Sequence, residues 1–188
     1  IIEHSRGKAT AIVVGTPIRH QGRIYNCAVV IRNGNIKGII PKIHLQSGGI
    51  FASGSDFLDG TVANGAFLDN GKDTVRDCFG SEIIYAGQRC NISPNLIFDF
   101  RGFSFAVEIG EDSYSPASTA SFCALSGATV IAHPAAENET ALKNRRRRMM
   151  LCGASTGKIS AYITASAGYG ESTQDMVYAG AASIYENG

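Results

Sequence analysis

The stretch that decides the fold is FSFAVEIGED, residues 103–112. Every second residue between 103 and 109 is apolar, so four large side chains share one face if the chain is extended. This period of two predicts a β-strand over residues 103–109. Gly110 follows the strand directly and precedes two acidic residues.

Short apolar runs of the same kind recur on both sides of this strand, with two helical segments among them. One helix is expected over 115–125, where Gly127 stops it, and a second from a cap at 138–140 to about Thr156. The expected strands cover 11–15, 26–31, 36–40, 81–85, 96–100, 128–132, 160–165 and 176–184. Strands interleaved with helices predict one layered α/β domain over residues 1–188.

Turn and loop residues divide these elements. The pair Asn33-Gly34 lies between two apolar runs, which predicts a β-hairpin. Residues 1–8 are expected to form the tail of a helix that Gly7 ends. Between residues 48 and 95, glycine, aspartate, serine and asparagine dominate, so most of this stretch is expected to be loop.

Charge and composition argue against several classes of function. The net charge of +1 provides no basic field for nucleic acid or membrane surfaces, so neither is an expected partner. No apolar run approaches the ~20 residues of a membrane span. The run 145–148 consists of four arginines, and we expect a solvated helix face with one buried arginine rather than a phosphate site.

Cysteine and histidine show no metal-binding pattern. The five cysteines are scattered and form no C-x-x-C pair, and the four histidines lack ligand spacing. We therefore expect no metal site, mostly buried and reduced thiols, and histidines on loops or the surface. Reduced thiols favour a cytoplasmic location. The cysteines are Cys27, Cys78, Cys90, Cys123 and Cys152, and the histidines are His4, His20, His44 and His133.

Four segments, taken in order, resemble the glutaminase domain of NAD synthase, a branch of the nitrilase superfamily. They are residues 25–28, 40–42, 107–112 and 165–173. The last segment contains Gly-Glu-Ser-Thr, a run typical of the NAD synthase branch rather than of nitrilases at large. The closing residues 186–188 also fit the family.

The resemblance implies a four-layer αββα sandwich, incomplete here because its N-terminal part is missing. It also implies glutamine amide hydrolysis, in which a thiolate attacks the amide, a glutamate is base and acid, and a lysine stabilises the oxyanion. The family's lysine follows a proline at a strand end, which is Lys42 here. The nucleophile position holds Gly110, and the glutamate belongs upstream of Ile1. We therefore expect this carbon-nitrogen hydrolase chain to be inactive or severely impaired.

Two other positions match substrate-binding positions of the family. Glu111 corresponds to a glutamate at the pocket edge, and Lys143 to a basic residue near the substrate carboxylate. We expect Lys42 and Gly110 to face one pocket, beside Glu111 and the loop carrying Ala135. The pocket walls depart from the family, because the segment after Leu45 is shortened and residues 135–137 replace substrate-contacting serines.

The resemblance also suggests partners. In the family the module passes ammonia to a separate synthetase domain, which is absent from this chain. The expected partners are glutamine, an NAD synthetase domain and, since nitrilase-type sandwiches commonly pair, a second copy. No cofactor is expected, because Gly168-Tyr169-Gly170 lacks the strand and helix of a dinucleotide site. One alternative is a degenerate, non-catalytic protein with a role in assembly, and a weaker one is a nitrilase relative that acts on another amide.

Overall fold

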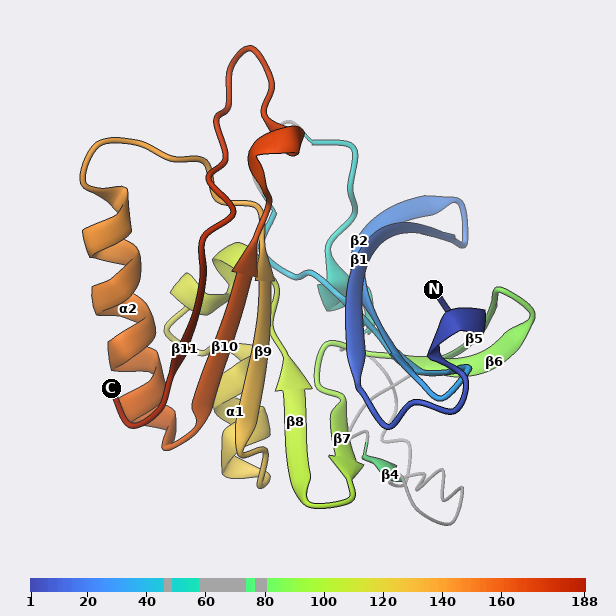
Figure 1. The fold of residues 1–188 in the computed structure, drawn as a ribbon. Helices are drawn as coiled ribbons and strands as arrows, with labels where there is room; N and C mark the ends of the chain where they lie inside the picture. The colour runs from blue at the N-terminus through green and yellow to red at the C-terminus, as the bar shows by residue number, and fades with distance from the viewer. Residues whose placement is uncertain (46–48, 58–73, 77–80) are drawn as a thin grey trace.

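The protein folds into two packed β-sheets with helices on one of them. The computed structural model describes residues 1–45, 49–57, 74–76 and 81–188. Within these residues the first sheet has the strand order β1-β2-β3-β6-β5, and the second has the order β11-β10-β9-β8-β7-β4 (Figure 1). Helices α1 (Thr119–Leu125) and α2 (Lys143–Lys158) pack against the second sheet. The predicted layered α/β fold is therefore confirmed.

The first sheet is built from hairpins. Asn33 and Gly34 have positive φ angles of 49° and 76°, as a two-residue hairpin turn requires, so the predicted hairpin is confirmed. Gln21 and Gly22 form a second such turn that was not predicted, and the strand expected at 11–15 therefore runs on to residue 20. The strands are β1 (Ile12–His20), β2 (Arg23–Arg32), β3 (Asn35–Pro41), β5 (Ser81–Tyr85) and β6 (Gln88–Ile92).

The second sheet contains the strand predicted over 103–109, which is formed by residues 103–107. Its strands are β4 (Thr74–Arg76), β7 (Ile97–Phe100), β8 (Phe103–Val107), β9 (Val130–Ala135), β10 (Ala161–Ser166) and β11 (Ala182–Tyr185). Strands β8, β9 and β10 pair in parallel. The residues that follow these three strands therefore meet at one edge of the sheet, which is where α/β proteins usually bind ligands.

The core between the sheets follows the period of two. Ala28 and Val30 of β2 belong to this core together with Phe105 and Val107 of β8. Phe103 is 41% exposed and lies at the rim, with its ring stacked on that of Phe105. Residues of the opposite parity in the second sheet face α1 and α2, where a separate apolar cluster includes Ile131, Tyr162 and Leu151.

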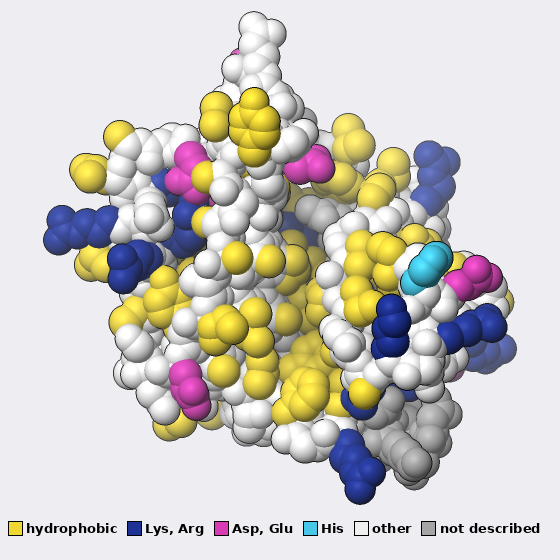
Figure 2. Space-filling model, viewed as in Figure 1, with side chains coloured by type: hydrophobic (Ala, Val, Ile, Leu, Met, Phe, Trp, Pro, Cys, Tyr) yellow, Lys and Arg dark blue, Asp and Glu magenta, His cyan; other side chains and the backbone are white. Residues whose placement is uncertain are grey.

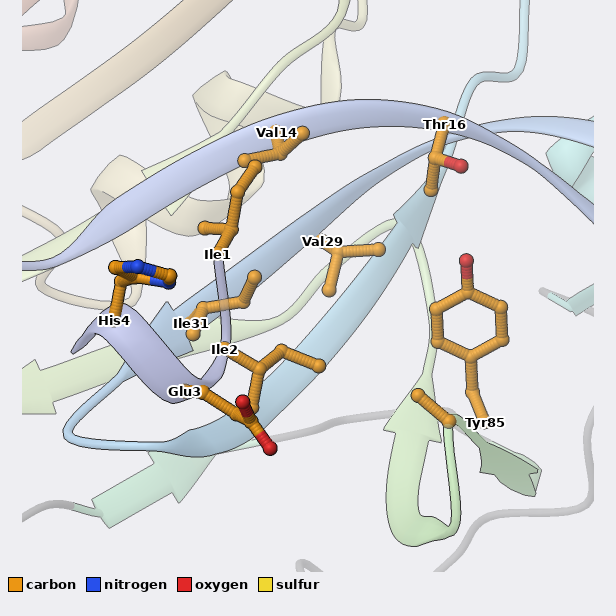
Figure 3. Close-up of a pocket in the computed structure, with 10 residues that line it drawn as sticks. Ile1, Ile2, Glu3, His4, Val14, Thr16, Val29, Ile31 and Tyr85 are labelled. Atoms are coloured by element: carbon orange, nitrogen blue, oxygen red, sulfur yellow. The ribbon is translucent and has the colours of Figure 1, made fainter. Parts of the chain in front are cut away.

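The outer face of the first sheet bears a short 3-10 turn, η1 (Glu3–Ser5), in place of the predicted helix tail. Figure 3 shows the apolar groove of about 520 Å³ beside this turn. Ile1 and Ile2 line it together with Val29 and Ile31, the β2 residues that point away from the inter-sheet core.

Several element boundaries differ from the predictions. Helix α1 begins at Thr119 rather than 115, because residues 110–114 form the 3-10 turn η3 (Gly110–Tyr114) and Ser118 caps the helix. Helix α2 begins after Leu142, so the predicted cap at 138–140 is wrong. The strand expected at 176–184 is reduced to β11, and β6 lies in the stretch expected to be loop. Two other 3-10 turns are η2 (Gly54–Phe57) and η4 (Tyr169–Glu171).

Two predictions about residue classes are confirmed where the structure describes them. Arg147 is buried, whereas the three other arginines of the run are exposed. Cys27, Cys90 and Cys123 are buried and Cys152 is half-buried, while Cys78 lies outside the described residues. In the described part of the chain, no helix combines the length and the apolar character needed to cross a bilayer.

Candidate functional site

A cavity of about 700 Å³ opens at the edge where β3, β8 and β9 end. Lys42 follows β3, Gly110 and Glu111 follow β8, and Ala135 ends β9; all four residues line the cavity. The prediction that Lys42 and Gly110 share a pocket beside Glu111 and the loop carrying Ala135 is therefore confirmed. Lys143 of α2 lines the same cavity, so it contains all four predicted site positions.

We call Lys42, Gly110 and Glu111 the inner end of the cavity. The Lys42 ammonium forms an ion pair with the Glu111 carboxylate, and their side chains are 10% and 30% exposed. A Cβ atom built on Gly110 would stand 3.4 Å from Lys42 Nζ, and its chain neighbours aside, no other described atom would lie within 4 Å. A side chain at position 110 would therefore meet the ammonium directly.

Local backbone contacts hold the inner end together. Gly110 has a φ of 50°, a left-handed conformation that glycine adopts readily. The Asp112 carboxylate accepts hydrogen bonds from the backbone N–H groups of Ile43 and His44, at 3.0 and 2.6 Å. These bonds tie the chain after β3 to η3. Burial raises the pKa of Asp112, and the two hydrogen bonds offset only part of this effect.

His133 lies buried on β9, and the prediction of a loop or surface position is wrong for this residue. Its Nε2 is 3.0 Å from the carbonyl oxygen of Gly110, and its Nδ1 is 3.1 Å from Thr164 Oγ1. Since a carbonyl only accepts, Nε2 donates to the Gly110 carbonyl, while Nδ1 forms its hydrogen bond with the threonine hydroxyl. Ser113 also donates to the Gly110 carbonyl, at 2.8 Å. The peptide that follows Gly110 is thus fixed from two sides.

Glu137 and Lys143 also line this cavity, and Arg146 and Arg147 line an adjoining one; we call these four residues the outer end. Arg147 Nε donates to Glu137 Oε2 at 3.1 Å, and these two side chains are only 7% and 6% exposed. Tyr114 donates to the second Glu137 oxygen at 2.6 Å. Burial alone would raise the pKa of Glu137, but the hydrogen bonds from Tyr114 and Arg147 outweigh it and lower the pKa.

The remaining cations of the outer end have different surroundings. Lys143 Nζ donates to the neutral Asn138 Oδ1 at 2.7 Å. Arg146 is exposed and lines an adjoining cavity. Figure 2 shows Lys and Arg side chains gathered over the upper part of α2, at the left of the molecule.

Among the described residues, Cys27 is the one cysteine in the lining of the cavity. Cys27 lines the cavity but is fully buried, and burial raises its pKa to about 12. Such a thiol is protonated near neutral pH and is a poor nucleophile. Cys123 is buried within α1. The described residues also contain no group of three or more His, Cys, Asp or Glu side chains placed to hold a metal ion.

Sequence reasoning missed His133 and the Glu137–Arg147 pair. In β9, His133 follows Ile131 by two residues, so the period of two places it in the same buried layer. This period was the signal in the sequence that could have predicted a buried position for His133. The partners of Glu137 come from η3 and α2, and no local pattern in the sequence indicates such contacts.

The whole chain aligns with glutamine-dependent NAD(+) synthetases. Those of Mycobacterium tuberculosis (strain H37Rv) and Mycobacterium bovis are 34% identical to it over 188 residues, and that of Mycobacterium leprae is 32% identical. The chain spans about a quarter of these relatives, 26% of their length. No protein-family profile matches it.

Solved structures share the fold. A glutamine-dependent NAD(+) synthetase from Cytophaga hutchinsonii superposes with a TM-score of 0.72 at 20% identity, covering 99% of this chain and 28% of that one. A branch 10 nitrilase-superfamily member from Saccharomyces cerevisiae superposes at 0.64 and 14% identity, covering 99% and 55%. The resemblance and the nitrilase-type fold predicted from the sequence are confirmed.

Proposed function

We propose that this chain, which is homologous to glutamine-dependent NAD(+) synthetases and has the nitrilase-type fold, holds the side-chain amide of glutamine at the inner end of its cavity. The observation that supports this is the position of Lys42 Nζ, 3.4 Å from where a side chain would begin at Gly110. An ammonium at that point can donate to the oxygen of an amide seated over Gly110, where negative charge develops during acyl transfer.

We further propose that the chain does not hydrolyse this amide at a useful rate. In the covalent mechanism a thiolate attacks the amide carbon, the C–N bond breaks as the amide nitrogen takes up a proton and leaves as ammonia, and water then hydrolyses the thioester. Gly110 offers no atom for the attack, so the thioester cannot form. What remains is binding and the charge of Lys42, which the Glu111 carboxylate holds at the cavity wall.

The longer relatives suggest the setting of this activity. They are named as glutamine-dependent synthetases of NAD(+), and this chain matches about a quarter of their length. We propose that the domain is descended from one that supplied ammonia to a synthetase domain. The chemistry proposed for it needs no cofactor.

Restoring the nucleophile tests the proposal. Gly110→Cys is treated with a chloroketone analogue of glutamine, and the labelled peptides are mapped by mass spectrometry. We expect a label at position 110 and protection by free glutamine, because thiol and amide would share one pocket. We expect the original chain to show no label in that peptide and no ammonia release from glutamine above the buffer blank.

Two matched variants make the result specific. Adding Lys42→Met to Gly110→Cys should slow labelling about tenfold, since a neighbouring ammonium lowers a thiol pKa from about 8.5. Gly22→Ala is the control for the strain of placing a side chain on a backbone with a positive φ, as at Gly110. Gly22 has a φ of 77°, and no described atom lies within 4 Å of a Cβ built on it. Labelling at position 110 that glutamine does not slow would refute the glutamine proposal and favour the assembly role.

A further inference from the structure

The four arginines at residues 145–148 serve three different surroundings around α2. Arg147 is buried in its ion pairs, and Arg146 lines the cavity that adjoins the candidate site. Arg145 and Arg148 line a separate cavity of about 440 Å³. This separate cavity shares no lining residue with either of the other two. We call it the α2–β11 cavity.

One wall of the α2–β11 cavity is a single face of the helix. Arg148, Met149 and Cys152 follow Arg145 by three, four and seven positions, so the four side chains are neighbours on the surface of α2. Both arginines are exposed and Met149 is 67% exposed, whereas Cys152 is half-buried. The guanidinium groups are therefore accessible to a ligand, and the thiol lies deeper.

The opposite wall comes from the end of β11 and the residues that follow it. Tyr185 is half-buried and packs against the apolar cluster that α2 shares with the second sheet. Gly188 is held against the helix, since its N–H donates to Ser155 Oγ at 3.3 Å and its carbonyl accepts from Cys152 Sγ at 3.0 Å. Figure 1 shows this part of the chain beside the lower turns of α2. Both walls of the cavity are thus held in place.

The α2–β11 cavity carries positive charge without a carboxylate side chain beside it. None of its lining residues is an aspartate or a glutamate. Within the part of the chain that the structure describes, no ion pair involves Arg145 or Arg148, whereas Arg147 pairs with two glutamates. Like charges one helical turn apart destabilise a helix. An anion bound between the two guanidinium groups would remove this repulsion.

We propose that the α2–β11 cavity binds a phosphate monoester that carries a small aromatic group. Each guanidinium can donate two parallel hydrogen bonds to phosphate oxygens. A phosphate monoester carries a charge of about −1.5 to −2 at pH 7, which matches two guanidinium groups, whereas a carboxylate balances only one. The aromatic group lies against Met149 and Tyr185. The volume of 440 Å³ falls within the range of about 300–1,000 Å³ that small-molecule sites occupy.

This inference differs from the solvated helix face that the arginine run alone suggested. Helical spacing predicts that four successive residues point in different directions, and the structure confirms that one of them is buried. The wall that β11 provides lies more than 30 positions further along the chain, so no local pattern indicates that two of the arginines border a cavity.

Calorimetric titration of the full chain with phenyl phosphate, inorganic phosphate and benzoate tests the site. We expect phenyl phosphate to bind about tenfold more tightly than either other ligand, because inorganic phosphate lacks the apolar contact and benzoate lacks the second charge. Arg148→Gln, at an exposed position, should weaken phenyl phosphate binding about tenfold through the loss of one charge-assisted contact. Arg146→Gln removes the same charge from the same helix and should leave this affinity unchanged.

Alkylation of Cys152 by iodoacetamide reports where the ligand lies. The modified peptides are mapped by mass spectrometry with and without saturating phenyl phosphate. We expect the ligand to slow modification of Cys152 in the original chain, because the thiol lies in the same cavity. In a variant that combines Arg145→Gln and Arg148→Gln, the same concentration of phenyl phosphate should give no protection.

The outcomes distinguish a built site from a charged surface. Inorganic phosphate that binds as tightly as phenyl phosphate, or an equal loss of affinity in Arg146→Gln and Arg148→Gln, would overturn the proposal and leave only general attraction to α2. Benzoate that binds as tightly as phenyl phosphate would refute a phosphate ligand. Binding of phenyl phosphate without protection of Cys152 would place the ligand elsewhere and also overturn the proposal. The glutamine proposal is unaffected by all of these results, because the two cavities share no residue.

Discussion

The two ends of the cavity enclose their charges in different ways. At the outer end, Arg147 and Glu137 are 7% and 6% exposed, and Tyr114 occupies the remaining carboxylate oxygen. At the inner end, Glu111 is 30% exposed, and the space beside Gly110 is open. A buried ion pair whose carboxylate oxygens both accept hydrogen bonds holds its two elements together. An ion pair that borders open space can exchange one of its contacts for a contact with a ligand. We therefore expect the outer pair to be structural and the inner pair to be the one that can contact a ligand.

The largest expected effect is on folding stability at the outer end. Arg147→Met leaves the Glu137 carboxylate buried without its cation, which typically costs about 3–5 kcal/mol. Lys42→Met should cost about 1 kcal/mol, because Glu111 can turn toward water. Urea unfolding of both variants measures the difference in unfolding free energy.

A double variant controls for the lost packing. Glu137→Gln combined with Arg147→Met should recover part of the loss, because the one carboxylate then left without Arg147 is that of Glu139, which is 24% exposed to water. If Arg147→Met and Lys42→Met lower the unfolding free energy by the same amount, the outer ion pair is no more important for stability than the inner one.

Much of the fold follows from local patterns. The period of two located β8, and the turn at Asn33-Gly34 located the β2–β3 hairpin. The inner end was predictable for the same reason, since Lys42 and Gly110 each follow a recognisable strand end in a known motif. Lys42 and Gly110 then lie close together if the two strands that precede them end on the same side of the two packed sheets.

The rest depends on contacts between distant segments. The cap predicted at 138–140 fails because Asn138 binds Lys143 and Glu139 binds Arg147, so neither side chain caps the helix. Strand β6 pairs with β5 across the turn at Ala86-Gly87, a local hairpin that was not predicted, whereas its parallel pairing with β3 joins Ile92 to Ile39, 53 positions earlier. The pairing with β3 is set by packing and does not appear in a window of sequence.

A second prediction concerns the layer beneath the inner end. His133→Leu removes the ring bonds to the Gly110 carbonyl and the Thr164 hydroxyl, and we expect a loss of about 1–3 kcal/mol in unfolding free energy. His133→Gln restores a donor and should recover part of this loss. Urea unfolding checks both values. A loss below about 0.5 kcal/mol would mean that the turn at Gly110 does not depend on the histidine.

The smallest expected effect is on the pH dependence of the unfolding free energy. The contributions of Glu137, at the outer end, and of Asp112, beside the inner end, should change with pH in opposite directions. The pKa of Glu137 is lowered from 4.5, so its ionised form stabilises the fold above that pH, and this contribution is lost as the pH falls through the folded-state pKa. The pKa of Asp112, beside the inner end, is raised from 3.8 by burial. The folded state then keeps a proton that the unfolded chain has released, so the contribution of Asp112 declines as the pH rises above 3.8.

Unfolding free energies measured from about pH 3 to 7 separate these contributions. The difference between the original chain and Glu137→Gln should grow as the pH rises toward 4.5. The difference between the original chain and Asp112→Asn should shrink as the pH rises above 3.8. The carboxylate of Asp99, whose pKa is lowered by Arg76 and Ser104 against the effect of burial, is common to all three proteins and cancels in both differences. Slopes of the same sign would mean that the two carboxylates are stabilised alike, although Glu137 accepts from a guanidinium and a phenol and Asp112 accepts from two backbone N–H groups.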